Sequence, residues 1–222
     1  MLRIAVLASG RGSNLQALID AIATGQLDAQ MVGVFSDKAD AFALERARRV
    51  GIAAIALNPR DFANRLAFDK QLFSHVDAVH PDVIVCAGYM RLLSEPEVHA
   101  HAGRMINIHP SLLPAFKGLR THEQALAAGV SEHGASVHVV SAKLDGGPVI
   151  AQARVAVLPG DDAVALAQRV LTREHRLLVE TLRLVSAGRL VLDRNGAALD
   201  GAPLSASLQL DGDDRLAAGD RR

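Results

Sequence analysis

The fold of this chain is decided by one stretch, Arg104-Met105-Ile106-Asn107-Ile108-His109-Pro110-Ser111-Leu112-Leu113-Pro114. Successive side chains of an extended strand point to opposite faces, so Asn107 and His109 share one face and the neighbouring isoleucines take the other. Pro110 favours extended backbone at His109 and has no N–H for a central ladder, so the strand is expected to end there. The sequence therefore predicts an amide and an imidazole together at the carboxyl end of a strand, where open α/β sheets bind ligands.

A third polar group follows in the acidic turn Leu144-Asp145-Gly146-Gly147-Pro148. If Asp145 meets Asn107 and His109, the amide can donate to a developing oxyanion, and the carboxylate can stabilise a protonated imidazole. Asp145 can also take a proton from an attacking amine, directly or through water. We interpret Asn107, His109 and Asp145 as candidate catalytic residues for moving an acyl group between nitrogens.

The same segment admits a hydrolase triad of Ser111, His109 and Asp145 as an alternative. Ser111 is not set in a Gly-x-Ser-x-Gly elbow and follows Pro110 directly. A serine and a histidine two positions apart on one segment rarely reach each other. The sequence therefore favours direct transfer over a covalent serine intermediate.

The amino-terminal segment predicts an anion site. Residues 2–8 are a nearly continuous apolar run, as in a buried parallel strand, and Ser9-Gly10-Arg11-Gly12-Ser13-Asn14 follows it. Apolar residues at helical spacing come next, and Ser13 with Gln16 forms a capping-box pattern, so a helix should begin at Ser13 or Asn14. Free N–H groups and a positive dipole end at this point favour a phosphate monoester.

Other interpretations of this loop stay open. A dinucleotide fingerprint needs a third glycine where Leu15 stands, and a P-loop needs a Gly-Lys-Ser/Thr sequence that the loop lacks, so both are disfavoured. Asp37, at the end of the second strand predicted over residues 31–35, keeps a dinucleotide-binding function open. A plain tight turn without a ligand is the remaining alternative.

Composition excludes several classes of protein. Lys plus Arg and Asp plus Glu both number 24, so bulk charge predicts no nucleic-acid or acidic-membrane partner. The single cysteine, Cys86, lies in an apolar run, which indicates a buried residue and a reducing compartment. No apolar run reaches spanning length and no leader pattern opens the chain. We expect a cytoplasmic protein that acts on small molecules, as a monomer or weak homodimer.

Strand and helix patterns alternate along the first half of the chain, which predicts an α/β fold with a doubly wound, mostly parallel central sheet and helices on both faces. Helices are expected over residues 39–50, 61–79, 95–100 and 163–187, and an antiparallel portion over 136–157 and 189–199. We expect a single catalytic domain over residues 1–210. Residues 211–222 lack apolar periodicity and predict a disordered tail.

Several polar residues have ordinary structural interpretations. His138 lies inside the strand predicted over 136–140 and is interpreted as a satisfied sheet residue. Glu174 lies in the middle of the long helix, where an exposed charge is the usual explanation. His122 is compatible with a helix cap, a substrate contact or neither. The histidines elsewhere show no metal-binding spacing, so no metal site is predicted.

The segments at 107–114 and 144–148 together resemble those of the folate-dependent formyltransferase family. The segment Ser9-Gly10-Arg11-Gly12-Ser13-Asn14-Leu15-Gln16 narrows the resemblance to members that act on a ribonucleotide in purine synthesis. The similarity extends from about residue 2 to residue 200 and includes 35–41 and 132–134. It implies the formyltransferase fold and formyl transfer from 10-formyltetrahydrofolate to the glycyl amine of glycinamide ribonucleotide.

The resemblance also implies residue roles. By position, Asn107, His109 and Asp145 match the catalytic residues. The ribonucleotide phosphate would be held by Gly12, Ser13 and Asn14, with Glu174 near the substrate's amino group. The folate site would comprise Arg65, Met90, Arg91, Leu92, Leu93 and Asn107. The family often has a polar residue where Leu171 stands, so no substrate contact is assigned there.

Related functions remain as alternatives to this interpretation. A methionyl-tRNA formyltransferase would carry a further carboxyl-terminal domain of about 100 residues. A formyltetrahydrofolate hydrolase would carry a regulatory domain before the catalytic one, whereas this chain starts at its first strand. A non-catalytic nucleotide-binding module would have little reason to keep Asn107, His109 and Asp145 together.

Overall fold

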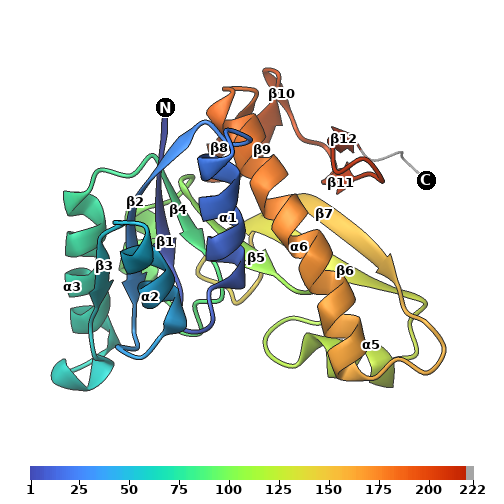
Figure 1. The fold of residues 1–222 in the computed structure, drawn as a ribbon, viewed down its shortest axis with the longest axis horizontal. Coiled ribbons are helices and arrows are strands. Elements are labelled where there is room, and N and C mark those ends of the chain that lie inside the picture. The colour runs from blue at the N-terminus through green and yellow to red at the C-terminus, as the bar shows by residue number, and fades with distance from the viewer. Residues whose placement is uncertain (219–222) are drawn as a thin grey trace.

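Strands and helices alternate from β1 to β5 and then give way to antiparallel strands (Figure 1). The computed structural model describes residues 1–218. Its strands are β1 (Leu2–Leu7), β2 (Ala29–Ser36), β3 (Ala54–Ala56), β4 (Val83–Cys86), β5 (Met105–His109), β6 (Glu132–Val139), β7 (Val149–Ala156), β8 (Leu190–Asp193), β9 (Gly196–Leu199), β10 (Ala202–Pro203), β11 (Leu208–Leu210) and β12 (Leu216–Ala218). Its helices are α1 (Ser13–Ala23), α2 (Phe42–Arg49), the 3-10 turn η1 (Pro59–Asp61), α3 (Arg65–Ala78), α4 (Glu95–Ala100), α5 (Thr121–Ala127) and α6 (Ala163–Ser186).

The order of strands in the main sheet is β12-β11-β7-β6-β5-β4-β1-β2-β3, and it reverses direction between β1 and β4. Strands β3, β2, β1, β4 and β5 are parallel, so their carboxyl ends meet at one edge. The crevice at such a reversal is where open α/β sheets bind ligands. Across it, the N–H of Ser9 after β1 donates to the carbonyl of Gly88 after β4 at 3.0 Å. The end of β5 lies on the same edge.

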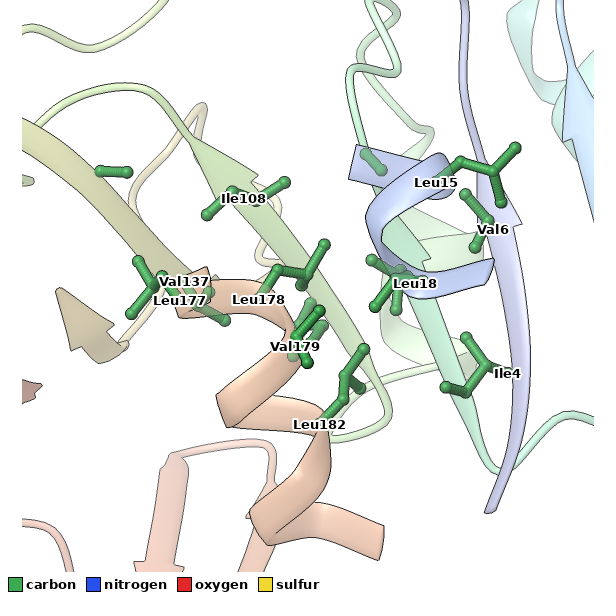
Figure 2. Packing of buried hydrophobic residues seen from close by; sticks show 14 of the residues in the cluster. Ile4, Val6, Leu15, Leu18, Ile108, Val137, Leu177, Leu178, Val179 and Leu182 are labelled. Atoms are coloured by element: carbon green, nitrogen blue, oxygen red, sulfur yellow. The ribbon is translucent and has the colours of Figure 1, made fainter. Parts of the chain in front are cut away.

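Side-chain alternation along the strands divides the core between the two faces of the sheet. On one face, residues of β1, β5 and β6 pack against α1 and α6 (Figure 2). This cluster includes Ile4, Val6, Leu15, Leu18, Ile108, Val137, Leu177, Leu178 and Leu182. On the other face, α3 covers the sheet through Phe68, Leu72, Phe73 and Val76. Each such buried side chain contributes about 1.5–3 kcal/mol, so this packing fixes the strand ends that carry the polar residues.

The predicted fold class is confirmed, because the sheet is parallel from β3 to β5, antiparallel from β5 to β7 and covered by helices on both faces. The helix predicted over residues 61–79 starts later than expected. Asn64 accepts a hydrogen bond from the N–H of Ala67 at 2.9 Å and so begins α3 at Arg65. Among the described residues, no helix is both long and apolar enough to cross a lipid bilayer.

The disordered tail predicted over residues 211–222 is wrong for residues 211–218. Strand β12 pairs with β11, and β11 in turn pairs with β7. Arg173 of α6 donates to Asp214 Oδ1 at 2.7 Å and to the carbonyl oxygens of Leu210 and Asp211. The partners of this segment are a sheet edge and a distant helix, so local apolar periodicity does not predict its order. Residues 219–222 lie outside the described residues.

Candidate active site

The structure brings the three predicted catalytic residues to one place. Asn107 and His109 share a face of β5, and Asp145 approaches them from the turn between β6 and β7. The Nδ1 atom of His109 lies 3.5 Å from Oδ2 of Asp145, and their side chains are 7% and 10% exposed. An imidazole and a carboxylate this close interact strongly when both are shielded from solvent, because little water screens the interaction.

The turn that carries Asp145 holds an unusual backbone conformation. Asp145 has φ +43°, in the left-handed region that aspartate tolerates better than most residues. Its Oδ2 accepts the N–H of Gly118 at 2.9 Å. A Cβ on Gly147 would lie 1.8 Å from the carbonyl oxygen of Val139, so only glycine fits this close approach. The turn is therefore built to aim one carboxylate at β5.

His138 is a member of the site that the sequence interpretation missed. It lies on β6 directly opposite Asn107, and its Nε2 is 3.0 Å from Nδ2 of that amide. Its Nδ1 lies 3.0 Å from the carbonyl oxygen of Val139, which can only accept, so the Nδ1 atom carries the proton. The Nε2 lone pair therefore accepts one N–H of Asn107. The second N–H of the amide is left to point at a ligand.

The protonation states of Asp145 and His109 depend on their burial and on their hydrogen-bond partners. Burial alone would raise the pKa of Asp145, but the hydrogen bond from the N–H of Gly118 and the nearby His109 help to bring it below 3.8. Burial lowers the pKa of His109 below 6.5, although the Phe116 carbonyl and Asp145 act in the opposite direction. The stabilised imidazolium expected from the sequence is thus outweighed by burial. At neutral pH Asp145 can accept a proton, and His109 gains one as negative charge develops beside it.

The loop before α5 contacts both His109 and Asp145. The Nε2 atom of His109 donates to the carbonyl oxygen of Phe116 at 3.0 Å, while Gly118 binds Asp145. Both ring nitrogens of His109 then face acceptors, an arrangement in which only the imidazolium donates two hydrogen bonds. The protonation of His109 is therefore tied to the position of this loop.

His122 also lies near this site. Its Nδ1 atom is 3.2 Å from Nε2 of the buried His133, and burial lowers the pKa of both histidines.

Ser111 is placed away from any catalytic role. Its hydroxyl donates to the carbonyl oxygen of Ala115 at 2.7 Å, and its own carbonyl accepts the hydroxyl of Ser136 at 2.7 Å. The ring nitrogens of His109 are turned to Phe116 and Asp145 instead. The geometry therefore gives the hydrolase triad no support.

The start of α1 is free of side-chain caps. Gly12 is the N-cap residue, with φ +70°, and a Cβ there would lie 2.8 Å from Cα and Cβ of Ala43. The predicted capping box is wrong, because Gln16 bonds Asp20 and Arg46 instead. The first N–H groups of the helix are therefore left for an anion, as the glycine turn predicted.

Glu174 is buried rather than exposed, which corrects the structural interpretation of this residue. It is 7% exposed, and its Oε1 accepts a hydrogen bond from Nδ2 of Asn14 at 3.3 Å. Burial raises the pKa of Glu174 to about 7, with Asn14 acting in the opposite direction. The contact exists because α6 packs against α1, far away in the sequence (Figure 1).

Two cavities meet at the candidate catalytic residues. The first, about 240 Å³, is lined by Arg65, Arg91, Leu92 and Leu93 and by the Val140–Leu144 side of the β6–β7 turn. The second, about 530 Å³, is lined by Asn14, Met90, His109, His122 and Glu174. Both are lined by Tyr89, Arg91, Leu92, Asn107, Leu144 and Asp145. Gly12 and Ser13 precede Asn14 but do not line either cavity, and neither does Leu171. A site with two lobes joined at the reacting groups suits two substrates.

The surroundings of Asp37 and Cys86 indicate structural rather than ligand-binding or nucleophilic roles. Asp37 accepts the hydroxyl of Ser9 at 2.5 Å, so it is engaged inside the protein rather than facing the crevice. Burial raises the pKa of the Cys86 thiol to about 12, which makes it a poor nucleophile. Within residues 1–218, no group of three or more His, Cys, Asp or Glu side chains has a metal-site arrangement.

Comparison with known proteins shows which family this chain resembles. Residues 2–182 match the model described as Formyl transferase. The chain is 50% identical over 203 residues to Phosphoribosylglycinamide formyltransferase of Escherichia coli (strain K12), covering 91% of this chain and 96% of that protein. It is 43% identical over 194 residues to the Trifunctional purine biosynthetic protein adenosine-3 of Homo sapiens, covering 87% of this chain and 19% of that longer protein. The structure of the phosphoribosylglycinamide formyltransferase from Coxiella burnetii matches with TM-score 0.88 and 46% identity, covering 92% of this chain and 96% of that one. The chain therefore belongs to the formyl transferase family.

Proposed function

We propose that this chain transfers the formyl group of 10-formyltetrahydrofolate to the glycyl amine of glycinamide ribonucleotide, in de novo purine biosynthesis. The observation that carries the proposal is the meeting of two cavities at Asn107 and Asp145, next to His109. The relatives from Escherichia coli and Coxiella burnetii, which have nearly the same length, bear the name phosphoribosylglycinamide formyltransferase.

In the proposed reaction the amine nitrogen bonds to the formyl carbon, a tetrahedral species forms, and the bond from that carbon to N10 of the folate then breaks. The free N–H of Asn107 donates to the oxyanion, a contribution of about 3–4 kcal/mol for a pre-aimed donor. His109, protonated as negative charge develops beside it, is the second group that stabilises the oxyanion. Asp145 takes the proton of the attacking amine, directly or through water, and the leaving N10 gains a proton.

The larger cavity is assigned to the ribonucleotide. The uncapped start of α1 offers the N–H groups of Gly12, Ser13 and Asn14 to the phosphate. Glu174 lies behind Asn14 and faces the same cavity, where its carboxylate suits an amino group. We assign no contact to Leu171.

The smaller cavity is assigned to the folate. Arg65, Arg91, Leu92 and Leu93 line it, and Asn107 closes its inner end. Leu92 and Leu144, which line both cavities, are 53% and 52% exposed. Large apolar side chains exposed together fit a flat aromatic ligand better than open solvent. The donor set at this site requires no metal in the proposed steps.

The proposal is tested by following 10-formyltetrahydrofolate consumption with and without glycinamide ribonucleotide. Consumption that depends on the ribonucleotide, with one N-formyl product per folate, is the expected result. Consumption without the ribonucleotide would indicate a formyltetrahydrofolate hydrolase instead. No consumption under either condition would indicate a non-catalytic binding module.

A further inference from the structure

One wall of the proposed folate cavity is the segment of residues 88–94, named here the folate loop. Tyr89, Arg91, Leu92 and Leu93 of this loop line the cavity. Met90 and Leu92 are 61% and 53% exposed, so hydrophobic burial does not hold the loop at these positions. Tyr89 and Leu93 pack against the core on the α3 face of the sheet, and polar contacts beneath the loop add to this packing.

Asp69 provides such a contact from α3. Its side chain is fully buried, and its Oδ2 accepts the N–H of Ser94 at 2.6 Å. Arg65, one helical turn earlier, and Arg91 of the folate loop supply the nearby positive charge, while burial raises the pKa of Asp69. The guanidinium of Arg91 lies 5.0 Å from the ring centre of Phe68, which keeps Arg91 against α3. A buried carboxylate is costly unless charges and donors surround it, so this arrangement is sensitive to the charge of Asp69.

The hydrogen bonding around Asp69 is incomplete. In residues 1–218, seven buried side-chain polar atoms have no hydrogen-bond partner, and four of them are Asp69 Oδ1, Tyr89 Oη, Arg91 Nε and Ser94 Oγ. These four atoms include both donors and acceptors. Since few direct bonds lock the loop on this side, the charge of Asp69 and its one short bond to Ser94 carry much of the positioning.

The amino-terminal half of the loop is linked by hydrogen bonds to a second buried carboxylate, that of Asp37. The N–H of Met90 donates to the hydroxyl oxygen of Ser9 at 2.9 Å, and that hydroxyl donates to Asp37 Oδ1 at 2.5 Å. Asp37 is 8% exposed. Two buried carboxylates therefore hold the folate loop by hydrogen bonds. Asp37 acts on Met90 through Ser9, and Asp69 bonds directly to Ser94.

We propose that Asp69 is a positioning residue for the folate, which holds the folate loop at Ser94 and balances Arg65 and Arg91. Asp69 touches neither cavity lobe directly, so it acts on folate affinity through the loop. Asp69 holds the loop at Ser94, next to Leu93, which lines only the smaller cavity, so we expect its effect mainly on the folate and little effect on ribonucleotide binding or the chemical step. This inference rests on the proposed function, because it assigns the smaller cavity to the folate.

The test compares Asp69→Asn with the wild type and with Asp77→Asn. Asparagine keeps an oxygen for the N–H of Ser94 and removes only the charge. Asp77 is a carboxylate on the same helix that binds His101 and Arg104, far from the folate loop in its contacts, and so controls for general effects on α3. The readouts are both KM values, kcat, and the Kd of the product tetrahydrofolate by titration calorimetry.

Asp69→Asn should raise the KM for 10-formyltetrahydrofolate and the Kd for tetrahydrofolate about tenfold, since hydrogen bonds to charged groups have that scale. The KM for the ribonucleotide and kcat should stay within about twofold, and Asp77→Asn should change none of these values. Asp69→Glu, which keeps the charge but displaces the carboxylate from the N–H of Ser94, should show the same selective loss and serves if Asp69→Asn does not fold.

Equal changes in both KM values, or an unchanged tetrahydrofolate Kd in both variants, would overturn the inference. Such a result with an active wild type would leave the proposed function intact. A wild type that neither turns over formyl-folate nor binds tetrahydrofolate would overturn the proposed function and this inference together.

Discussion

Asn107 and His138 face each other across the antiparallel pair β5 and β6, with 3.0 Å between the amide Nδ2 and the imidazole Nε2. The carbonyl of Val139 fixes the proton of His138 on Nδ1, so the amide has only one orientation that forms a hydrogen bond. The pair therefore presets the N–H that the proposed oxyanion requires. This preset orientation is a property of the sheet register.

Replacing His138 with alanine should free the Asn107 amide and lower kcat about tenfold, the scale of one hydrogen bond. Both KM values should change little, because the amide acts mainly on the transition state. Steady-state kinetics with each substrate varied gives the separation. His101→Ala is the matched control, since His101 is also buried but binds Asp77 away from the site. A normal kcat in His138→Ala would contradict the role of the pair.

Replacing Glu174 with glutamine should change stability in a pH-dependent way. Burial raises the pKa of Glu174 to about 7, above its ordinary 4.5. The folded state then binds the proton more tightly, so this stabilising contribution is present below pH 4.5 and is lost as pH rises through 7. E174Q should match the wild type near pH 5 and exceed it by up to about 3 kcal/mol at pH 8.

Urea unfolding at the two pH values measures this difference directly. Activity of E174Q with the ribonucleotide should fall at the same time, since the carboxylate is assigned to its amino group. The same stability difference at both pH values would show that Glu174 titrates normally in the folded protein.

A valine in place of Gly12 should damage the phosphate site alone. The backbone there has φ +70°, and the new side chain would strike the backbone of α2 at Ala43. The KM for glycinamide ribonucleotide should rise about tenfold or more, with little change for the folate. Gly10→Val is the control, because a Cβ at Gly10 has no atom within 4 Å. Equal rises in both KM values would place the phosphate elsewhere.

Ser111→Ala should keep nearly full activity. The hydroxyl of Ser111 bonds the carbonyl of Ala115 and does not meet His109, so the variant should lose about 1 kcal/mol of stability and little of kcat. Rapid-mix kinetics should show no burst of tetrahydrofolate in the wild type. A burst, together with near-total loss of activity in the variant, would restore the triad.

Local sequence patterns predicted what is local in this structure. The shared face of Asn107 and His109 follows from strand periodicity, and the end of the strand follows from Pro110. The doubly wound sheet follows from alternating apolar runs and helices. The residues at 144–148 predicted an acidic turn, whereas its approach to β5 was only a supposition that the geometry now supports. These features depend on neighbours within a few positions of the chain.

Features that depend on distant partners were missed. The approach of His138 to Asn107 depends on the register between β5 and β6, which no single strand pattern encodes. The burial of Glu174 depends on α6 packing against α1. The capping-box pattern at Ser13 failed because Gly12 takes the cap position and Arg46 of α2 holds Gln16. The order of residues 211–218 depends on Arg173 and the edge strand β11.

The most direct measurement of the central claim compares kcat and tetrahydrofolate affinity in Asp145→Asn. Asparagine roughly keeps the shape of the side chain and its bond to Gly118, but it cannot take a proton from the amine. The account predicts a fall in kcat of about 100-fold or more, with the Kd for tetrahydrofolate changed less than about threefold. A variant with wild-type kcat would contradict the account and remove Asp145 from the reaction.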